Sequence, residues 1–401
     1  MDPTWLDSLL VTQILQSEEG IEDLEVIQYK CQPAVPVGTN YLSHLYRISI
    51  HYKTGPVGSI KSTSLIVKTP LLSGEMKRFL ERGNGYQREF NIYNKVLPKL
   101  YELHSARLTA KSFPCPLHES LVLEDLHLRG YKMADRLVQL DFRHCQLFLK
   151  SLAKFHALSY AAHKTRPQLI EGVGKNLFYN EDLQGSDQKL MRDMTVGLLR
   201  SMSNTVRTLD VSTHYAEKIE KLADSSWERM VRILKPDGAL SVLNHGDTWT
   251  NNILFKYNEA GEVMDVRLVD FQYAQYCSFS LDIIYFWWTS ANEEVREHHQ
   301  EKLFEDYCET LNNTFLELNC DRTLSREIFS QEMKAGAPYS LYVMSTVLGV
   351  AMADPDNLLQ FNEISQDDFT KDFNKKNLTS KYYKAVLPKM LEQVEKFGAF
   401  E

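Results

Sequence analysis

The segment 244–252, Asn-His-Gly-Asp-Thr-Trp-Thr-Asn-Asn, constrains this chain most, because it sets three polar side chains at a fixed spacing. His245, Asp247 and Asn252 form the pattern His-x-Asp-x-x-x-x-Asn. Eighteen residues after Asn252, at the end of a segment rich in β-branched residues, comes Asp270, followed by Phe and Gln. Three fixed letters arise by chance in long chains, but here a predicted β-hairpin joins them to a second carboxylate. The ordered set therefore indicates a functional site.

Phosphoryl transfer from ATP to an alcohol gives these residue types a physical reason. A carboxylate must orient the alcohol and accept its proton, and Mg²⁺, which prefers oxygen ligands, must bridge the phosphates. A carboxylate and a side-chain amide on opposite strands of the hairpin, predicted at 253–255 and 266–269, can hold that metal from fixed positions. We predict that Asp247 is the catalytic base, that Asn252 and Asp270 are catalytic residues that bind the metal, and that ATP and Mg²⁺ are the cofactors.

Strand patterns dominate the first ~125 residues, where segments 41–52, 64–68 and 121–123 are rich in β-branched, aromatic and aliphatic residues. Between them, Phe90 and the apolar residues that follow it recur at helical spacing, and Pro98 is expected to bend or end that helix. The N-terminus is expected to form an amphipathic helix. This part of the chain therefore predicts a small β-rich unit.

The rest of the chain is mainly helical in pattern. Segment 141–159 predicts a strong helix with one apolar face, and most of 175–235 and 291–400 also favours helix, with the hairpin between them. We predict an α+β fold of two lobes, since 401 residues are too many for one compact core. Residues 1–126 form the N-terminal, ATP-binding lobe, and residues 127–401 form the C-terminal lobe with the catalytic loop and the substrate site.

Composition excludes several other classes of protein. The formal charge is −8 and there is no basic run, so we expect no nucleic-acid partner. No apolar stretch approaches the ~18 residues of a membrane span, and the N-terminus lacks the basic region of a signal peptide. The six cysteines are scattered, which favours reduced thiols over a disulfide framework or a zinc site. We expect a cytoplasmic monomer whose partner is a small-molecule alcohol.

Several segments resemble one known family over nearly the whole chain. HGDTWTNNILFKY, VDFQ, SLDIIYF, LVLEDL, LAKFHALS and EFNIYNKVLPKL resemble the insect ecdysteroid-kinase-like family, also called CHK kinase-like, which is related to choline kinases and aminoglycoside phosphotransferases. The resemblance implies a two-lobed protein-kinase-like fold and an ATP-dependent kinase acting on a hydroxyl of an ecdysteroid or hydroxylated xenobiotic. A choline- or ethanolamine-type kinase stays open and requires an aromatic cage with acids. A pseudokinase binding module also stays open, although no residue of the predicted catalytic set is lost.

The same resemblance assigns the nucleotide-binding residues. Lys68 ends the strand at 64–68, where kinase-like folds place the lysine that holds the α- and β-phosphates, and Glu89 on the next helix is its expected partner. Ser43 belongs to segment 38–43, where a phosphate-covering loop is expected, although this segment has one glycine rather than three. Glu124 and Leu126 fall at the hinge, where backbone groups would bind adenine.

Other positions are predicted to support the site. The resemblance implies that His245 braces the catalytic loop and that Asp282 is the buried acid that holds its backbone. Trp249 is a candidate for the substrate pocket, whereas the aromatic residues at 285–288 and His156 are expected to lie in the core. Gly246 replaces the arginine of protein kinases and no APE-like segment follows Asp270, which disfavours a protein substrate.

Overall fold

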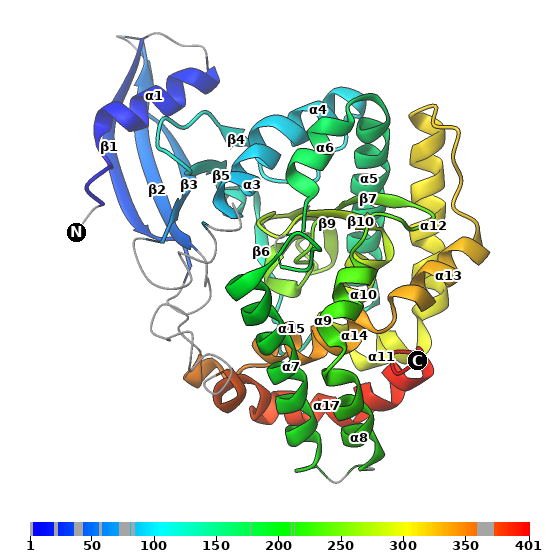
Figure 1. Cartoon of the computed structure of the whole chain (residues 1–401). Helices are drawn as coiled ribbons and strands as arrows, with labels where there is room; N and C mark the ends of the chain where they lie inside the picture. Colours follow the sequence, from blue (N-terminus) through cyan, green and yellow to red (C-terminus); the bar gives the residue numbers. More distant parts are fainter. Residues whose placement is uncertain are drawn as a thin grey trace.

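The computed structural model describes residues 3–19, 23–35, 43–55, 58–71, 81, 85–176, 178–209, 211, 213–358 and 373–401. The described residues form a small β-rich lobe and a larger, mainly helical lobe, which confirms the predicted fold class (Figure 1). Most of segment 38–43, the expected phosphate-covering loop, lies outside the described residues, and only Ser43 is described.

The N-terminal lobe is built on a five-stranded antiparallel sheet with the order β1-β2-β3-β5-β4. Its strands are β1 (Leu24–Pro33), β2 (Ser43–Thr54), β3 (Lys61–Pro70), β4 (Ser112–Phe113) and β5 (Leu121–Glu124). Three of these strands were predicted. Strand β1 was missed, because its alternation of apolar and polar residues is interrupted at Val26-Ile27, where the pairing register with β2 shifts.

The two faces of this sheet contact different parts of the protein, because successive side chains of a strand point to opposite faces. Ile48 and Ile50 of β2 and Val67 of β3 are buried against the predicted N-terminal helix, α1 (Ser8–Glu19), which covers that face (Figure 1). On the opposite face, Ile66 and Lys68 of β3 line a cavity between the lobes. The alternation therefore aims Lys68 into the interlobe space.

A continuous helical run follows the sheet: α3 (Gly85–Asn91), a π-helical turn (Ile92–Val96) and α4 (Leu97–Leu103). Pro98 does not end this helix. It lies in the first turn of α4, and the π-helical turn directly precedes it. Glu89 is in α3, with its side chain buried on the side that faces β3.

The C-terminal lobe holds most of the helices. They are α5 (Phe142–Thr165), α6 (Pro167–Gly174), α7 (Gly185–Val206), α8 (His214–Ala223), α9 (Ser226–Ile233), α10 (Ser280–Thr289), α11 (Glu293–His298), α12 (Gln300–Glu317), α13 (Arg326–Gly336), α14 (Tyr339–Ser345), α15 (Val347–Ala351) and α17 (Lys381–Lys396). Helix α5 begins after its N-cap Asp141, whose side chain accepts a bond from the His144 N–H. The predicted apolar face of α5 is buried, and α5 packs along α12. No described helix has the length and apolar character needed to cross a membrane.

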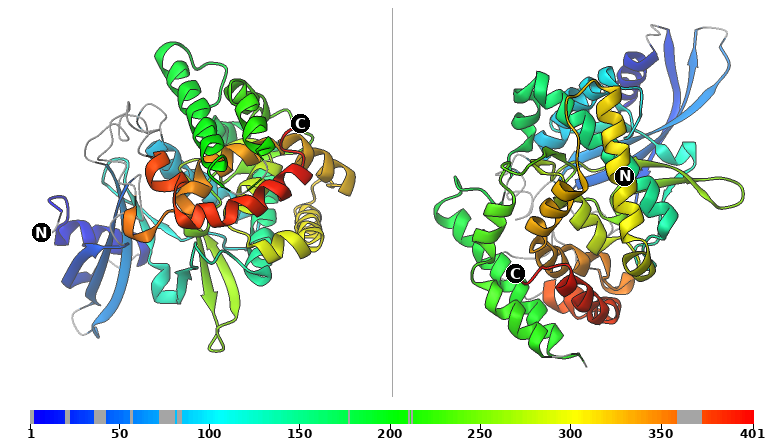
Figure 2. Two further views of the ribbon diagram at one scale, coloured as in Figure 1. Left: turned by 90° about the horizontal axis from the view of Figure 1, so that it is seen from below. Right: turned by 90° about the vertical axis from the view of Figure 1, so that its right-hand side faces the viewer.

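Two small sheets lie inside this helical lobe. The predicted hairpin is β8 (Ile253–Tyr257) and β9 (Val263–Leu268), which β6 (Tyr131–Met133) extends to three strands. Figure 2 shows the hairpin extending away from the body of the lobe. Strands β7 (Ser241–Asn244) and β10 (Gln275–Ser278) pair with each other. This second pair places the segment that begins at Asp270 directly beside the catalytic loop.

Candidate active site

A cavity of about 630 Å³ lies between the lobes and is lined by eight of the eleven predicted site residues. The lining residues include Lys68, Glu89, Glu124, Leu126, Asp247, Trp249, Asn252 and Asp270. Ser43 is not among them. It is buried at the start of β2, opposite Pro70, so its predicted phosphate contact remains a prediction. Residues from five separated parts of the chain thus converge on one space.

Lys68 links the N-terminal lobe to the segment after the hairpin. Its Nζ lies 2.7 Å from Oε2 of Glu89 and 2.9 Å from Oδ1 of Asp270, and both Lys68 and Glu89 are buried. Burial alone would lower the pKa of Lys68, but the two carboxylates outweigh it and raise that pKa, so the ammonium stays charged. Burial raises the pKa of Glu89, and Lys68 opposes that shift. The predicted Lys68–Glu89 pair is therefore present in the structure.

Asp247 is held through both carboxylate oxygens. Asn252 Nδ2 donates to Asp247 Oδ2 at 2.7 Å and to the Asp247 main-chain oxygen at 2.9 Å, and the Tyr285 hydroxyl donates to Oδ1. Burial, followed by repulsion from Asp270, raises the pKa of Asp247 from 3.8 to about 7. A pKa near neutrality suits a group that must accept a proton and release it again.

Asn252 and Asp270 also offer oxygens suited to a divalent cation. Both amide hydrogens of Asn252 point to Asp247, which leaves its Oδ1 as an acceptor, while Asp270 uses Oδ1 for Lys68. Among the residues that the structure describes, no group of three or more His, Cys, Asp or Glu is arranged around a metal position. Two protein oxygens, with phosphates and water completing the shell, fit Mg²⁺ rather than a metal that needs an all-protein cage.

Two residues of the site adopt a left-handed backbone. Asp270 has φ +70°, which is uncommon for a residue with a side chain and is typical of strained functional positions. Gly246 has φ +80°, and a Cβ there would lie 2.0 Å from the main-chain oxygen of Tyr273. Glycine at 246 is therefore required by the close approach of the two loops, which accounts for the absence of the arginine found in protein kinases.

Asp282 and His245 support the catalytic loop as the sequence predicted. Asp282 accepts bonds from the main-chain N–H groups of His245 at 2.6 Å and Gly246 at 2.8 Å, and from His156 Nε2 at 3.1 Å. His245 Nδ1 accepts a bond from the Asp247 N–H, and its Nε2–H donates to the oxygen of Val269. Burial lowers the pKa of His245, so it is a neutral brace between the two loops.

The hinge contains a polar cluster that was not predicted. Asp125 is buried, and its carboxylate accepts bonds from Arg47 Nε and from Ser64 Oγ, each at 2.8 Å, and caps the 3₁₀ turn Leu126–Arg129 through the His127 N–H. The Glu124 side chain turns to Arg129, whose Nη1 donates to its Oε1 at 2.8 Å. Asp125 lies in LVLEDL, between the two predicted hinge residues. This position was the only feature of the sequence that could have marked it.

Arg88 is a second residue that sequence reasoning missed. Its guanidinium is buried beside the cavity, where Nη1 donates to the Ala274 oxygen at 2.9 Å and Nη2 donates to the Lys175 oxygen. Burial lowers the pKa of Arg88 to about 10. It therefore joins α3 to the segment after Asp270. Its signal was weak, because an arginine beside Glu89 is normally a surface charge.

Tyrosines form much of the cavity wall beside Asp247. Tyr285, Tyr339, Tyr342 and Tyr179 follow one another in tilted, stacked and edge contact, with ring centroids 6.5, 5.8 and 5.3 Å apart along the series. The other apolar lining residues on this side include Met191, Met194, Leu198, Leu234, Val347 and Val350. We call the four tyrosines the tyrosine wall. They come from α10, α14 and the segment after α6, so no local pattern could have predicted the wall.

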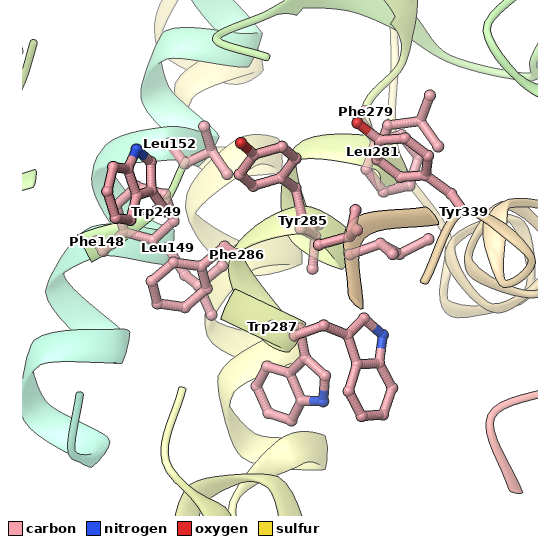
Figure 3. Packing of buried hydrophobic residues seen from close by; sticks show 14 of the residues in the cluster. Phe148, Leu149, Leu152, Trp249, Phe279, Leu281, Tyr285, Phe286, Trp287 and Tyr339 are labelled. Carbon is pink, nitrogen blue, oxygen red and sulfur yellow. The ribbon is translucent and has the colours of Figure 1, made fainter. Parts of the chain in front are cut away.

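The aromatic cluster at 285–288 separates into two groups. Phe286, Trp287 and Trp288 are buried in the core as predicted, with Phe286 stacked on Phe148 at 4.1 Å. Tyr285 is buried in the same core, and in addition it lines the cavity and its hydroxyl contacts Asp247, which was not expected. Figure 3 shows Tyr285 and Trp287 projecting in different directions from α10. Trp249 is 7% exposed and lines the cavity.

Comparison with solved structures found distant likenesses. The chain is 16% identical to a Plasmodium vivax ethanolamine kinase, over 88% of this chain and 81% of that one, with a TM-score of 0.39. It is 12% identical to a microcompartment-associated aminopropanol kinase, over 98% and 99%, with a TM-score of 0.41. It is 10% identical to a choline/ethanolamine kinase family protein from Mesorhizobium loti, over 92% of both chains, with a TM-score of 0.36. At these TM-scores the likenesses decide nothing about the acceptor.

A search of curated proteins found no match to this chain. A sequence model of the ecdysteroid kinase-like family matches residues 37–320, a range that covers more than half of the chain. The matched range contains Lys68, Glu89, Asp247, Asn252 and Asp270, whose contacts are described above. The chain therefore belongs to the ecdysteroid kinase-like family.

Proposed function

We propose that this protein is an ATP- and magnesium-dependent kinase that phosphorylates a hydroxyl group of a bulky, largely apolar small molecule. Membership of the ecdysteroid kinase-like family supports a small-molecule phosphotransferase. The observation that carries the proposal is the position of Asp247. It is held by Asn252 and Tyr285 in the same cavity that contains the Lys68–Glu89–Asp270 cluster.

In the proposed reaction, the acceptor oxygen bonds to the γ-phosphorus while the bond from that phosphorus to the β–γ bridging oxygen breaks. The electron pair of the broken bond leaves with ADP, and the hydroxyl proton passes to the Asp247 carboxylate. Lys68, oriented by Glu89, supplies positive charge to the α- and β-phosphates. Mg²⁺ bound at Asn252 and Asp270 supplies charge neutralisation for the phosphates.

The acids of the cavity support an acceptor without several positive charges. The carboxylates that line the described cavity belong to Glu89, Glu124, Asp125, Asp247 and Asp270. All except Asp247 lie within salt-bridge distance of a lysine or arginine. A polycationic aminoglycoside would need several carboxylates whose charge is not already balanced. Glu89 and Asp270 share the single ammonium of Lys68, so the described lining leaves the charge of Asp247 and of one further carboxylate unbalanced.

The tyrosine wall supports an acceptor with a broad apolar surface. Two of its hydroxyls are engaged within the protein: Tyr179 with Thr195 Oγ1 at 2.9 Å, and Tyr285 with Asp247. The acceptor side therefore offers ring faces, methionines and aliphatic groups more than free polar groups, as small-molecule sites commonly do. An ecdysteroid or a hydroxylated xenobiotic matches this surface, and the indole of Trp249 could pack against its rings.

The same tyrosines support a second candidate, a choline- or ethanolamine-type kinase, because several aromatic rings can hold a quaternary ammonium by cation–π attraction. A single screen separates the candidates. ATP consumption and product mass are measured with ecdysone-like steroids, hydroxylated xenobiotics, choline, ethanolamine and kanamycin-like sugars at matched concentrations. We expect the largest kcat/KM for an apolar alcohol. A far larger value for choline or an aminoglycoside would overturn the acceptor proposal and leave the kinase proposal intact.

The nucleotide proposal has its own test. Titration calorimetry with a non-hydrolysable ATP analogue should show binding that requires Mg²⁺ and that weakens in Lys68→Ala. Lys154→Ala, a change on α5 away from the cavity lining, is the matched control and should bind like the unaltered protein. Equal and Mg²⁺-independent binding by the unaltered protein and Lys68→Ala would refute the proposed arrangement.

A further inference from the structure

Helix α10 contacts the catalytic loop at two points that lie one turn apart. At the first point, Asp282 accepts the N–H groups of His245 and Gly246, while its own N–H donates to Asn244 Oδ1 at 3.2 Å. Thr248 Oγ1 donates to the Asp282 main-chain oxygen at 2.9 Å. At the second point, Tyr285 donates to Asp247. Residues three apart share a helix face, so one face of α10 holds both the loop backbone and its carboxylate.

Contacts of α10 with the helices of the core fix the position of the Tyr285 ring relative to the catalytic loop. Phe286 stacks on Phe148 of α5, and Trp287 packs on Phe304 of α12 with ring centroids 4.9 Å apart. These contacts hold α10 against the core, as Figure 3 shows for Phe286 and Phe148. Burial and the adjacent Asp247 raise the pKa of Tyr285 well above its usual range, so it stays a neutral donor. The hydroxyl is therefore a fixed donor.

An aspartate side chain has two rotatable bonds, and its carboxylate can turn unless both oxygens are held. Asn252 holds Oδ2 of Asp247, and Tyr285 holds Oδ1, so the plane of the carboxylate is defined by donors from two different elements. Each oxygen keeps further acceptor capacity for the substrate. Loss of the Asn252 contact would also disturb the proposed metal site, whereas loss of the Tyr285 hydroxyl would affect Asp247 alone.

We propose that Tyr285 is a positioning residue for phosphoryl transfer: its hydroxyl fixes the Asp247 carboxylate so that a free lone pair faces the acceptor hydroxyl. The inference rests on the proposed function, because it assumes that Asp247 is the base. Tyr285 adds no proton-transfer step and no charge. It acts by keeping the reacting groups in a productive geometry, where a displacement of about 1 Å can lower a rate by on the order of 10²-fold.

The test is Tyr285→Phe, which removes the hydroxyl and keeps the ring, compared with Tyr383→Phe. Tyr383 is also fully buried, and its hydroxyl donates to the Met344 oxygen at 3.1 Å, but it does not line the cavity. Both changes should lower the melting temperature to a similar extent. Tyr285→Phe should lower kcat by roughly 10- to 100-fold, with KM for ATP and the Kd of an ATP analogue unchanged. Tyr383→Phe should leave kcat unchanged.

A double-mutant cycle separates positioning from a general effect on the fold. In the Asp247→Asn background, Tyr285→Phe should cause little further loss of the residual rate, because the group that it positions is already absent. Tyr285→Leu should reproduce the kcat loss of Tyr285→Phe. If Tyr285→Phe has near-normal kcat, or raises only KM for the acceptor, the inference is wrong and Tyr285 is a wall residue. If Asp247→Asn itself keeps near-normal kcat, the proposed role of Asp247 as the base fails instead.

Discussion

Arg47 on β2 reaches across the sheet to the hinge, where its Nε lies 2.8 Å from Oδ2 of the buried Asp125. Ser64 on β3 donates to the same oxygen. A single carboxylate therefore ties two strands of the N-terminal lobe to the turn at which the chain enters the C-terminal lobe. These contacts hold the backbone of the hinge in one geometry.

This cluster leads to a graded stability prediction. Asp125→Ala should destabilise the protein by about 3 kcal/mol, because it leaves a partly buried guanidinium and a buried hydroxyl without their acceptor. Ser64→Ala removes one neutral donor and should cost about 1 kcal/mol. The free energy of unfolding is measured by urea denaturation, and the variants are compared at matched m-values. Equal losses for the two variants would show that the carboxylate does not organise the hinge.

The proposed base and metal ligands lead to a kinetic prediction. Asp247→Asn, Asn252→Ala and Asp270→Ala should each lower kcat by on the order of 10²–10⁴-fold with the fold retained, because the proton acceptor or the charge that stabilises the transition state is lost. Asp306→Asn is the matched control, since Asp306 is a buried carboxylate on α12 that pairs with Lys302 at 2.9 Å, outside the cavity lining. A near-normal kcat for Asp247→Asn would remove Asp247 from the mechanism.

Two glycines with the same backbone angle distinguish the cost of a left-handed backbone from the cost of a steric clash with an added Cβ. Gly246 and Gly261 both have φ +80°, but a Cβ at 246 would lie 2.0 Å from the Tyr273 oxygen, whereas a Cβ at 261 meets nothing within 4 Å. Gly261→Ala should cost about 1–2 kcal/mol, the penalty of a left-handed conformation, and leave kcat unchanged. Gly246→Ala should cost more and lower kcat at least about tenfold, since Asp247 must shift. Thermal unfolding and steady-state kinetics measure both effects, and identical behaviour of the two variants would contradict the close approach.

The raised pKa of Asp247 predicts how stability depends on pH in the absence of Mg²⁺ and nucleotide. Because its pKa is about 7 in the folded protein and 3.8 ordinarily, the folded state binds more protons between these values, and Asp247 lowers stability as pH rises from about 4 to 7. Asp247→Asn removes this dependence. Its melting temperature should match that of the unaltered protein near pH 4 and exceed it near pH 8. A constant difference across this range would contradict the raised pKa.

The sequence predicted the catalytic loop well because its residues are close together in the chain. His245, Asp247 and Asn252 lie within eight residues, and a short hairpin brings Asp270 back to them, so spacing and turn signals were sufficient. Lys68 and Glu89 followed from the family resemblance, which implies a lysine at the end of this strand and an acid on the helix after it. Short, irregular elements such as β7 and β10 gave no comparable signal, since four residues show no reliable periodicity.

The acceptor side could not be predicted, because its residues meet only through tertiary packing. Tyr179, Tyr285 and Tyr339 lie on elements separated by long stretches of chain, and each tyrosine alone resembles a core residue. Tyr285 did carry a usable signal, since it follows Asp282 by three residues on one helix and must share its face. The backbone strain at Asp270 had no sequence signal, because only a fixed tertiary environment maintains such a conformation.

The contacts of Asp282 have a consequence for how the catalytic loop is ordered. Through His156 on α5, which Tyr307 on α12 also contacts at 2.7 Å, this carboxylate joins the loop amides to the long helices of the core. The conformational entropy of the loop is therefore lost once, when the lobe folds, and not in every turnover. Substrate binding then does not need to order these loop amides, because Asp282 already holds them.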